Sequence, residues 1–105
     1  MNWIEWYRIV AYREFHDVPR CVLVADSAED AFWILDAPFD EDSDAYSPIY
    51  TIHDAGCDLA EAEASFERHA GNVGVLPAFG CIPVAHVQFD ATQRAALKLT
   101  SPPIT

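Results

Sequence analysis

The residues with the clearest chemical potential are carboxylates, and they are gathered in one part of the chain. Between Arg20 and Arg68 there are thirteen aspartates and glutamates and no lysine or arginine. The formal net charge of the whole chain is -11. A one-sided field of this kind attracts basic partners and repels nucleic acid and anionic membrane surfaces. The charge pattern therefore predicts a protein that binds a basic protein partner.

Several of these acids occupy positions where a negative charge would destabilise a predicted helix. Asp36 falls at the C-terminal end of a predicted helix, where the helix dipole disfavours negative charge, and the acidic run 40–44 follows it. Glu63 and Glu67 form a like-charge pair four residues apart on another predicted helix, which is slightly destabilising. We therefore expect these acids to contact the partner, with neighbouring aromatic side chains as anchors. The predicted partner-binding residues are Asp36, Phe39, Asp40, Glu41, Asp42, Asp44, Tyr46, Tyr50, Glu63 and Glu67.

Metal-ligating patterns are weaker than the charge pattern. The run 40–44 resembles the start of a calcium loop, but its sixth position is Ala45 instead of glycine and its twelfth is Thr51 instead of glutamate. No cysteines or histidines have the short spacing that places two zinc ligands on one turn or one helix face. We expect neither a metal nor another cofactor.

A nucleophilic site would combine Cys57 with His53, four residues before it in a strand-to-helix turn. A helix N-terminus favours the thiolate, but Asp54 and Asp58 flank the pair and disfavour it. The sequence thus predicts a protein that is not an enzyme and has no catalytic residues. A small enzyme or a metal-dependent regulator that uses Cys57, His53 and His69 stays open as an alternative.

The predicted elements that position these residues begin with two strands. Residues 3–15 are rich in aromatic and β-branched types and pair with the apolar segment 21–25. Ser27 then caps a predicted helix whose apolar stripe extends through Leu35. After the acidic loop, residues 47–53 form a third predicted strand.

The second half of the chain contains two capping patterns. Asp58-Leu-Ala-Glu61 is a capping box that opens a second helix, and Asp90-Ala-Thr-Gln93 repeats the pattern before a third helix through Leu99. Further strands are predicted at residues 73–79 and 81–89. The order is about ββαβαββα. The predicted fold class is α+β, with one largely antiparallel sheet and its helices packed on one face.

Size and composition indicate one domain over residues 1–105. Hydrophobic residues make up 51% of the chain, enough for a core at this length. Its three cysteines are widely spaced, which is typical of a reducing compartment and not of a disulfide framework. We expect a cytoplasmic protein, because the sequence shows no signal peptide and no membrane-spanning run.

In size, acidity and predicted organisation, without a catalytic motif, the chain resembles the immunity proteins of bacterial polymorphic toxin systems. The resemblance extends over the whole chain and is greatest to those of contact-dependent growth inhibition. It implies a cognate toxin domain, commonly a DNase or a tRNA-cleaving RNase, that is bound tightly one-to-one and inhibited. An alternative is a nucleic-acid mimic that blocks DNA-binding enzymes. The mimic would compete with DNA for several proteins, whereas an immunity protein would neutralise one toxin variant.

Overall fold

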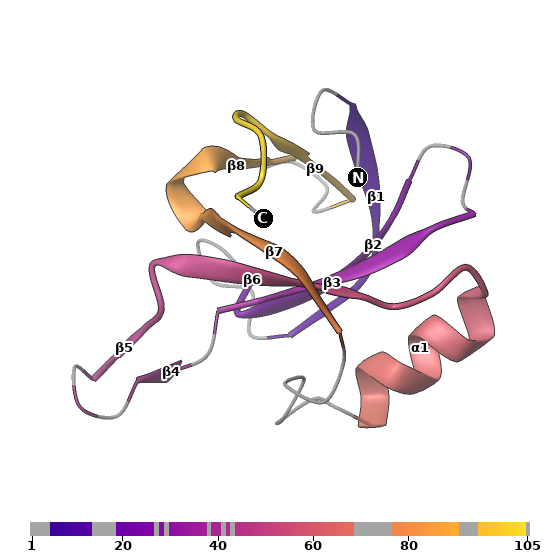
Figure 1. Cartoon of the computed structure of the whole chain (residues 1–105), viewed down its shortest axis with the longest axis horizontal. Coiled ribbons are helices and arrows are strands. Elements are labelled where there is room, and N and C mark those ends of the chain that lie inside the picture. The colour runs from indigo at the N-terminus through magenta and orange to yellow at the C-terminus, as the bar shows by residue number, and fades with distance from the viewer. Residues whose placement is uncertain are drawn as a thin grey trace.

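The computed structural model describes residues 5–13, 19–26, 28, 30–37, 39–40, 42, 44–68, 77–90 and 95–104. Over these residues the chain is mostly β-sheet, with one α-helix (Figure 1). The elements are β1 (Trp6–Arg13), β2 (Cys21–Ala25), β3 (Phe32–Asp36), β4 (Phe39–Asp40), β5 (Ala45–Tyr46), β6 (Ile49–Asp54), α1 (Leu59–Arg68), β7 (Ala78–Pro83), a 3₁₀ turn (Val84–His86), β8 (Val87–Phe89) and β9 (Ala96–Leu99). Among the described residues, no helix is both long and apolar enough to cross a membrane.

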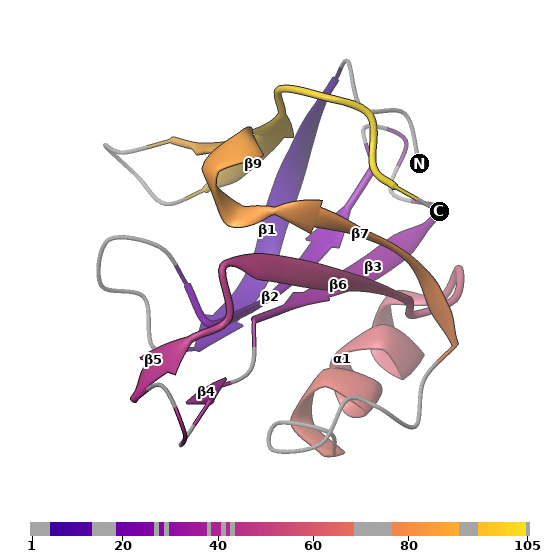
Figure 2. The same cartoon turned by 60° about the vertical axis from the view of Figure 1, so that its left-hand side comes forward.

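Seven strands form one antiparallel sheet in the spatial order β7-β6-β3-β2-β1-β9-β8. The two edge strands, β7 and β8, are separated in the chain by only the turn Val84–His86. The sheet must therefore curl until its edges approach each other, and Figures 1 and 2 show this half-barrel. The backbones of Ile104 and Cys81 exchange two hydrogen bonds of 2.7 Å, so the segment after β9 pairs with the opposite edge.

Successive side chains of each strand point to opposite faces of the sheet, so one set of them lies inside the half-barrel. Tyr7 and Trp33 meet there edge to face, with ring centroids 5.9 Å apart. Burial of each large apolar side chain contributes about 1.5–3 kcal/mol, so this interior is the main source of stability. The interior cluster consists of Tyr7, Ile9, Val22, Val24, Leu35, Ala37, Tyr50, Ile52, Ile82, Val87, Leu97 and Leu99.

Helix α1 covers the outer face of the sheet over β2 and β3. Its buried residues Ala62 and Phe66 pack with the outward side chains of those strands. The predicted capping box is confirmed at its first bond, because the Glu61 amide donates to Asp58 Oδ1 at 2.9 Å. Arg13 of β1 contacts the helix through a cation–π interaction, with its guanidinium carbon 5.0 Å from the centroid of the Phe66 ring.

The α+β prediction is wrong, because two of the three predicted helices are strands where the structure describes them. The first was predicted from Ser27 through Leu35, and its second half belongs to β3, which extends over Phe32–Asp36. Phe32 and Ile34 face α1 while Leu35 faces the interior. A strand buried on both faces has a continuous apolar run, and such a run also matches a helical stripe.

The third predicted helix is wrong for the same kind of reason. Residues 91–94 lie outside the described residues, but Ala96–Leu99 is β9. Leu97 and Leu99 are fully buried and Lys98 between them is half-buried, which is the period-two pattern of a strand. The predictions of strands within 3–15, at 21–25 and within 47–53 are confirmed by β1, β2 and β6. The strand predicted at 81–89 is divided by the 3₁₀ turn after Pro83.

Candidate protein-binding surface

The acidic run lies in a short β-hairpin that projects from the half-barrel (Figures 1 and 2). Its strands β4 and β5 pair through Phe39 with Tyr46 and Asp40 with Ala45. Asp42 and Asp44, between the two strands, are exposed. Asp44 has φ 54°, a left-handed conformation that aspartate tolerates better than most residues with a side chain. The turn therefore favours aspartate at this position, and it presents two carboxylates to solvent.

Among the predicted contact residues, this hairpin brings Asp42, Asp44 and Tyr46 together. Tyr46 is 44% exposed, as expected of an aromatic anchor before binding. Phe39 and Asp40 form β4, but their side chains are outside what the structure describes, and Glu41 lies outside the described residues.

The two predicted contact residues of α1 belong to a different part of the surface. Glu63 and Glu67 are exposed on the helix, which lies apart from the hairpin in both views (Figures 1 and 2). Glu67 Oε2 is 3.3 Å from Nη2 of Arg13, so this acid has an ion-pair partner within the chain. The acids that are continuous in the sequence are thus divided between two surfaces.

Asp36 and Tyr50 are not surface residues. Asp36 is 8% exposed and ends β3, so the helix-dipole argument for it does not apply. Tyr50 is fully buried, and its hydroxyl donates a hydrogen bond to the carbonyl of Pro19. The expectation that both contact a partner is corrected: each side chain is used inside the fold.

Asp36 belongs to a buried polar group under the outer face of the sheet. It lies opposite Cys21 on β2. Burial raises the pKa of Asp36, while the nearby Arg20 and His53 act in the opposite direction. Burial, together with the charge of Asp36, raises the pKa of the Cys21 thiol to about 12. Cys21 therefore stays a neutral thiol at physiological pH and has a structural role.

Of the residues of the enzyme alternative, the structure describes Cys57 and His53, and these two differ in accessibility. Cys57 is exposed, whereas His53 on β6 is only 5% exposed. His69 lies outside the described residues. Within the part of the chain that the structure describes, no group of three or more His, Cys, Asp or Glu side chains is arranged to hold a metal ion. This arrangement gives no geometric basis for catalysis by Cys57 with His53.

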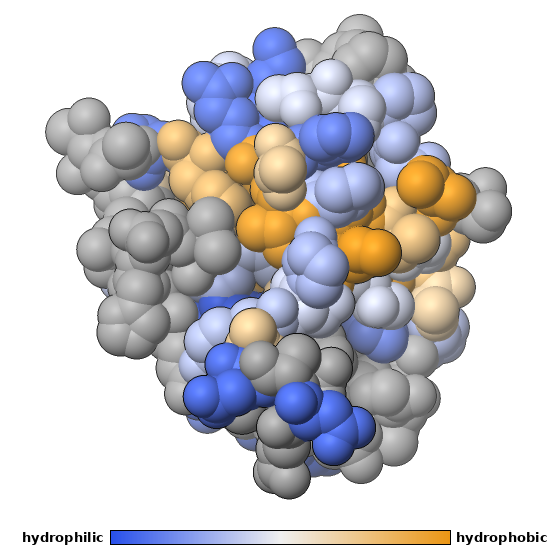
Figure 3. Space-filling model, turned by 90° about the vertical axis from the view of Figure 1, so that its left-hand side faces the viewer, coloured by the Kyte–Doolittle hydropathy of each residue, from blue (hydrophilic) through white to orange (hydrophobic). Residues whose placement is uncertain are grey.

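A small pocket of about 190 Å³ opens where the hairpin joins the half-barrel. Ile49 at the start of β6 is 43% exposed beside this region. Figure 3 shows hydrophobic residues gathered on this face, above the hydrophilic tip of the hairpin. Among the residues that line it only Arg20 is charged, and the exposed carboxylates of Asp42 and Asp44 lie further out, between β4 and β5. The lining consists of Pro19, Arg20, Ala37, Tyr46, Ser47, Pro48 and Val84.

Sequence reasoning missed this pocket because its lining comes from four separate segments of the chain. Only Tyr46 was predicted as a contact residue. Val84 lies in the 3₁₀ turn, and its amide donates to the carbonyl of Pro48 at 2.9 Å. That contact depends on the curl of the sheet, which no local pattern encodes.

Comparisons with known proteins provide no relative from which a role could be transferred. No protein-family model, no curated protein and no solved structure matches this chain. Its function must be inferred from its own charge, shape and exposed side chains.

Proposed function

We propose that this chain is an immunity-type inhibitor that binds a basic nuclease toxin domain one-to-one and blocks its activity. The observation that carries the proposal is the projecting β4–β5 hairpin with Asp42 and Asp44 exposed near its tip. Nucleases hold the phosphate backbone with lysine and arginine side chains, so their substrate clefts are concave and positively charged. An acidic ribbon is complementary to such a cleft in both shape and charge.

The charge of the whole chain supports fast association. A net charge of -11 produces a long-range attraction for a basic domain, and attraction of this kind raises association rates while adding less to final affinity. On this account Glu63 and Glu67 contribute to steering, and the hairpin supplies the direct contacts. The association rate should therefore fall as salt rises.

Retention of the partner needs buried apolar contact in addition to charge. Tyr46 belongs to the hairpin and also lines the pocket at its base. Ile49 follows the lining residues Ser47 and Pro48 in the chain and is 43% exposed. Binding energy is concentrated in aromatic and apolar anchors that become desolvated in the complex. We therefore place the centre of the interface at this junction and the acids around it.

The test uses affinity capture with three immobilised proteins. One bait is the wild type, and one carries Asp42→Lys with Asp44→Asn, which keeps a residue that tolerates the left-handed backbone. The third carries Glu63→Lys with Glu67→Gln, which changes the net charge by the same amount on α1. We expect the hairpin variant alone to lose a basic protein that the wild type retains.

The captured protein must then pass an activity assay. One equivalent of the wild-type chain should inhibit its nuclease activity, and an excess of unrelated basic DNA-binding proteins should remain unaffected. Inhibition of several such proteins would instead identify a nucleic-acid mimic. Equal capture by all three baits, or a partner without nuclease activity, would contradict the proposed function.

A further inference from the structure

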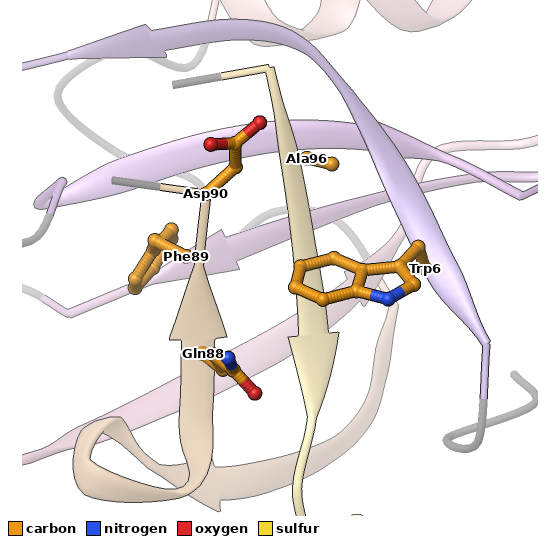
Figure 4. A pocket seen from close by; sticks show the side chains of 5 residues that line it. All are labelled: Trp6, Gln88, Phe89, Asp90 and Ala96. Carbon is orange, nitrogen blue, oxygen red and sulfur yellow. The ribbon is translucent and has the colours of Figure 1, made fainter. Parts of the chain in front are cut away.

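The strands β1, β9 and β8 lie apart from both the hairpin and α1 in Figure 1, and a second surface site lies on their outer side. It is an open pocket of about 460 Å³, within the range of about 300–1,000 Å³ that is usual for small-molecule sites. Figure 4 shows its lining side chains. They are Trp6, Gln88, Phe89, Asp90 and Ala96.

The register of the strands explains the hollow. Trp6 and Gln88 are both cross-strand partners of Lys98, one from each side, so these three side chains share the outer face. Two residues before Lys98, the small side chain of Ala96 fills little space on the same face. The indole of Trp6, which is 44% exposed, forms one wall of the resulting hollow (Figure 4).

The opposite wall is polar. Gln88 and Asp90 are separated by one residue and lie on the same side of the chain (Figure 4), while Phe89 between them packs against the interior cluster. The amide of Asp90 donates to the carbonyl of Ala96 at 2.9 Å, which continues the pairing of β8 with β9. The site thus combines an aromatic platform with a carboxamide and a carboxylate.

The charges around the hollow restrict the ligand. Asp90 and the net charge of -11 disfavour an anion. Arg8 is the cross-strand partner of Ala96, so Arg8 and Lys98 share this face and disfavour a cation. A neutral ring that carries hydroxyls avoids both penalties, because each hydroxyl both donates and accepts hydrogen bonds.

We propose that this pocket binds a neutral sugar ring, with its C–H face stacked on the indole of Trp6. Gln88 and Asp90 then accept hydrogen bonds from its hydroxyls, and the side-chain amide of Gln88 donates to its oxygens. The inference is independent of the proposed inhibitor function, because the pocket shares no residue with the hairpin surface.

The test begins with an array of neutral, anionic and cationic glycans probed with the labelled wild-type chain. The neutral oligosaccharide that binds best is then titrated into ¹⁵N-labelled protein, and the indole Nε1–H resonance of Trp6 is followed. We expect neutral glycans to be preferred and the Trp6 resonance to shift. This measurement locates the site in the unmodified protein and depends on no substitution.

Matched variants test the stacking contact. Trp6→Ala should weaken binding by about tenfold or more, because it removes the platform. Tyr12→Ala is the control, since Tyr12 is 45% exposed on the same strand and lies outside the pocket. Its affinity should stay within about twofold of the wild type. The proposal is overturned if no neutral glycan binds, if charged glycans bind better, if the Trp6 resonance does not shift, or if both variants have similar affinity.

Discussion

Replacement of Tyr50 by phenylalanine tests whether this residue, which the sequence placed among the contact residues, is part of the core. The substitution removes one hydroxyl and keeps the ring of a fully buried side chain. That hydroxyl donates to the carbonyl of Pro19, which joins β6 to the segment before β2. Pro19 is itself buried, so its carbonyl has little access to water after the change.

The magnitude follows from the loss of one buried hydrogen bond. Such a bond contributes about 0.5–1.5 kcal/mol, and an unsatisfied buried partner costs about 1–3 kcal/mol. We expect the free energy of unfolding to fall by about 1–3 kcal/mol. For a domain of this size each kcal/mol lowers the melting temperature by about 4–8 °C.

Urea denaturation followed by circular dichroism measures the difference. The midpoint for Tyr50→Phe should fall with the denaturant slope unchanged, because the surface exposed on unfolding is the same. Tyr46→Phe is the control, since Tyr46 is 44% exposed, and its stability should stay within about 0.5 kcal/mol. Equal stability of wild type and Tyr50→Phe would refute the structural role assigned to this hydroxyl.

Three further predictions concern the outer face of the sheet. Phe66→Ala should lower the free energy of unfolding by about 3–5 kcal/mol, since Phe66 is 2% exposed. The control is Leu59→Ala on the same helix, at a position 41% exposed, which should lower it by less than about 1 kcal/mol. Equal losses for the two variants would contradict the packing of α1. In native protein at pH 8, iodoacetamide should modify the exposed Cys57 and leave the buried Cys21 intact, as peptide mass spectrometry can show; rapid modification of Cys21 would contradict its burial. Because burial raises the pKa of Asp36, the folded state binds the proton of this carboxyl group more tightly than the unfolded state does. The free energy of unfolding of the wild type relative to Asp36→Asn should therefore fall as pH rises from about 4 through that raised pKa. Denaturation curves at several pH values test this, and an unchanged or opposite difference would contradict it.

Local signals predicted some elements correctly, but the same capping pattern beginning at Asp90 predicted a helix where the structure has β9. Asp58 and Glu61 mark the start of α1, and the β-branched and aromatic residues of β1 predict a strand. The helix predicted over residues 32–35 is wrong because four consecutive apolar residues fit both a buried strand and one side of a helix. Burial between α1 and the half-barrel decides the outcome, and that environment exists only after the distant strands have paired.

The candidate surface was only partly predictable for a related reason. The run 40–44 predicts an exposed acidic loop, and the structure has the hairpin β4–β5 there; the contact role of Tyr46 stays a prediction. The fold then divides the acidic block, with Asp36 inside and Glu67 paired to Arg13 on another surface. Charge that is contiguous in a sequence becomes a contiguous surface only when the topology keeps it together.

The most direct test of the central claim is the association rate with the isolated nuclease partner, measured by stopped-flow fluorescence over a range of salt concentrations. We predict that Asp42→Lys with Asp44→Asn lowers the rate at low salt by about tenfold or more, and that the difference shrinks as salt rises. The charge-matched variant Glu63→Lys with Glu67→Gln should have a smaller effect. Equal rates for the two variants, or a hairpin variant that binds as fast as the wild type, would contradict the claim that the acidic hairpin engages a basic partner.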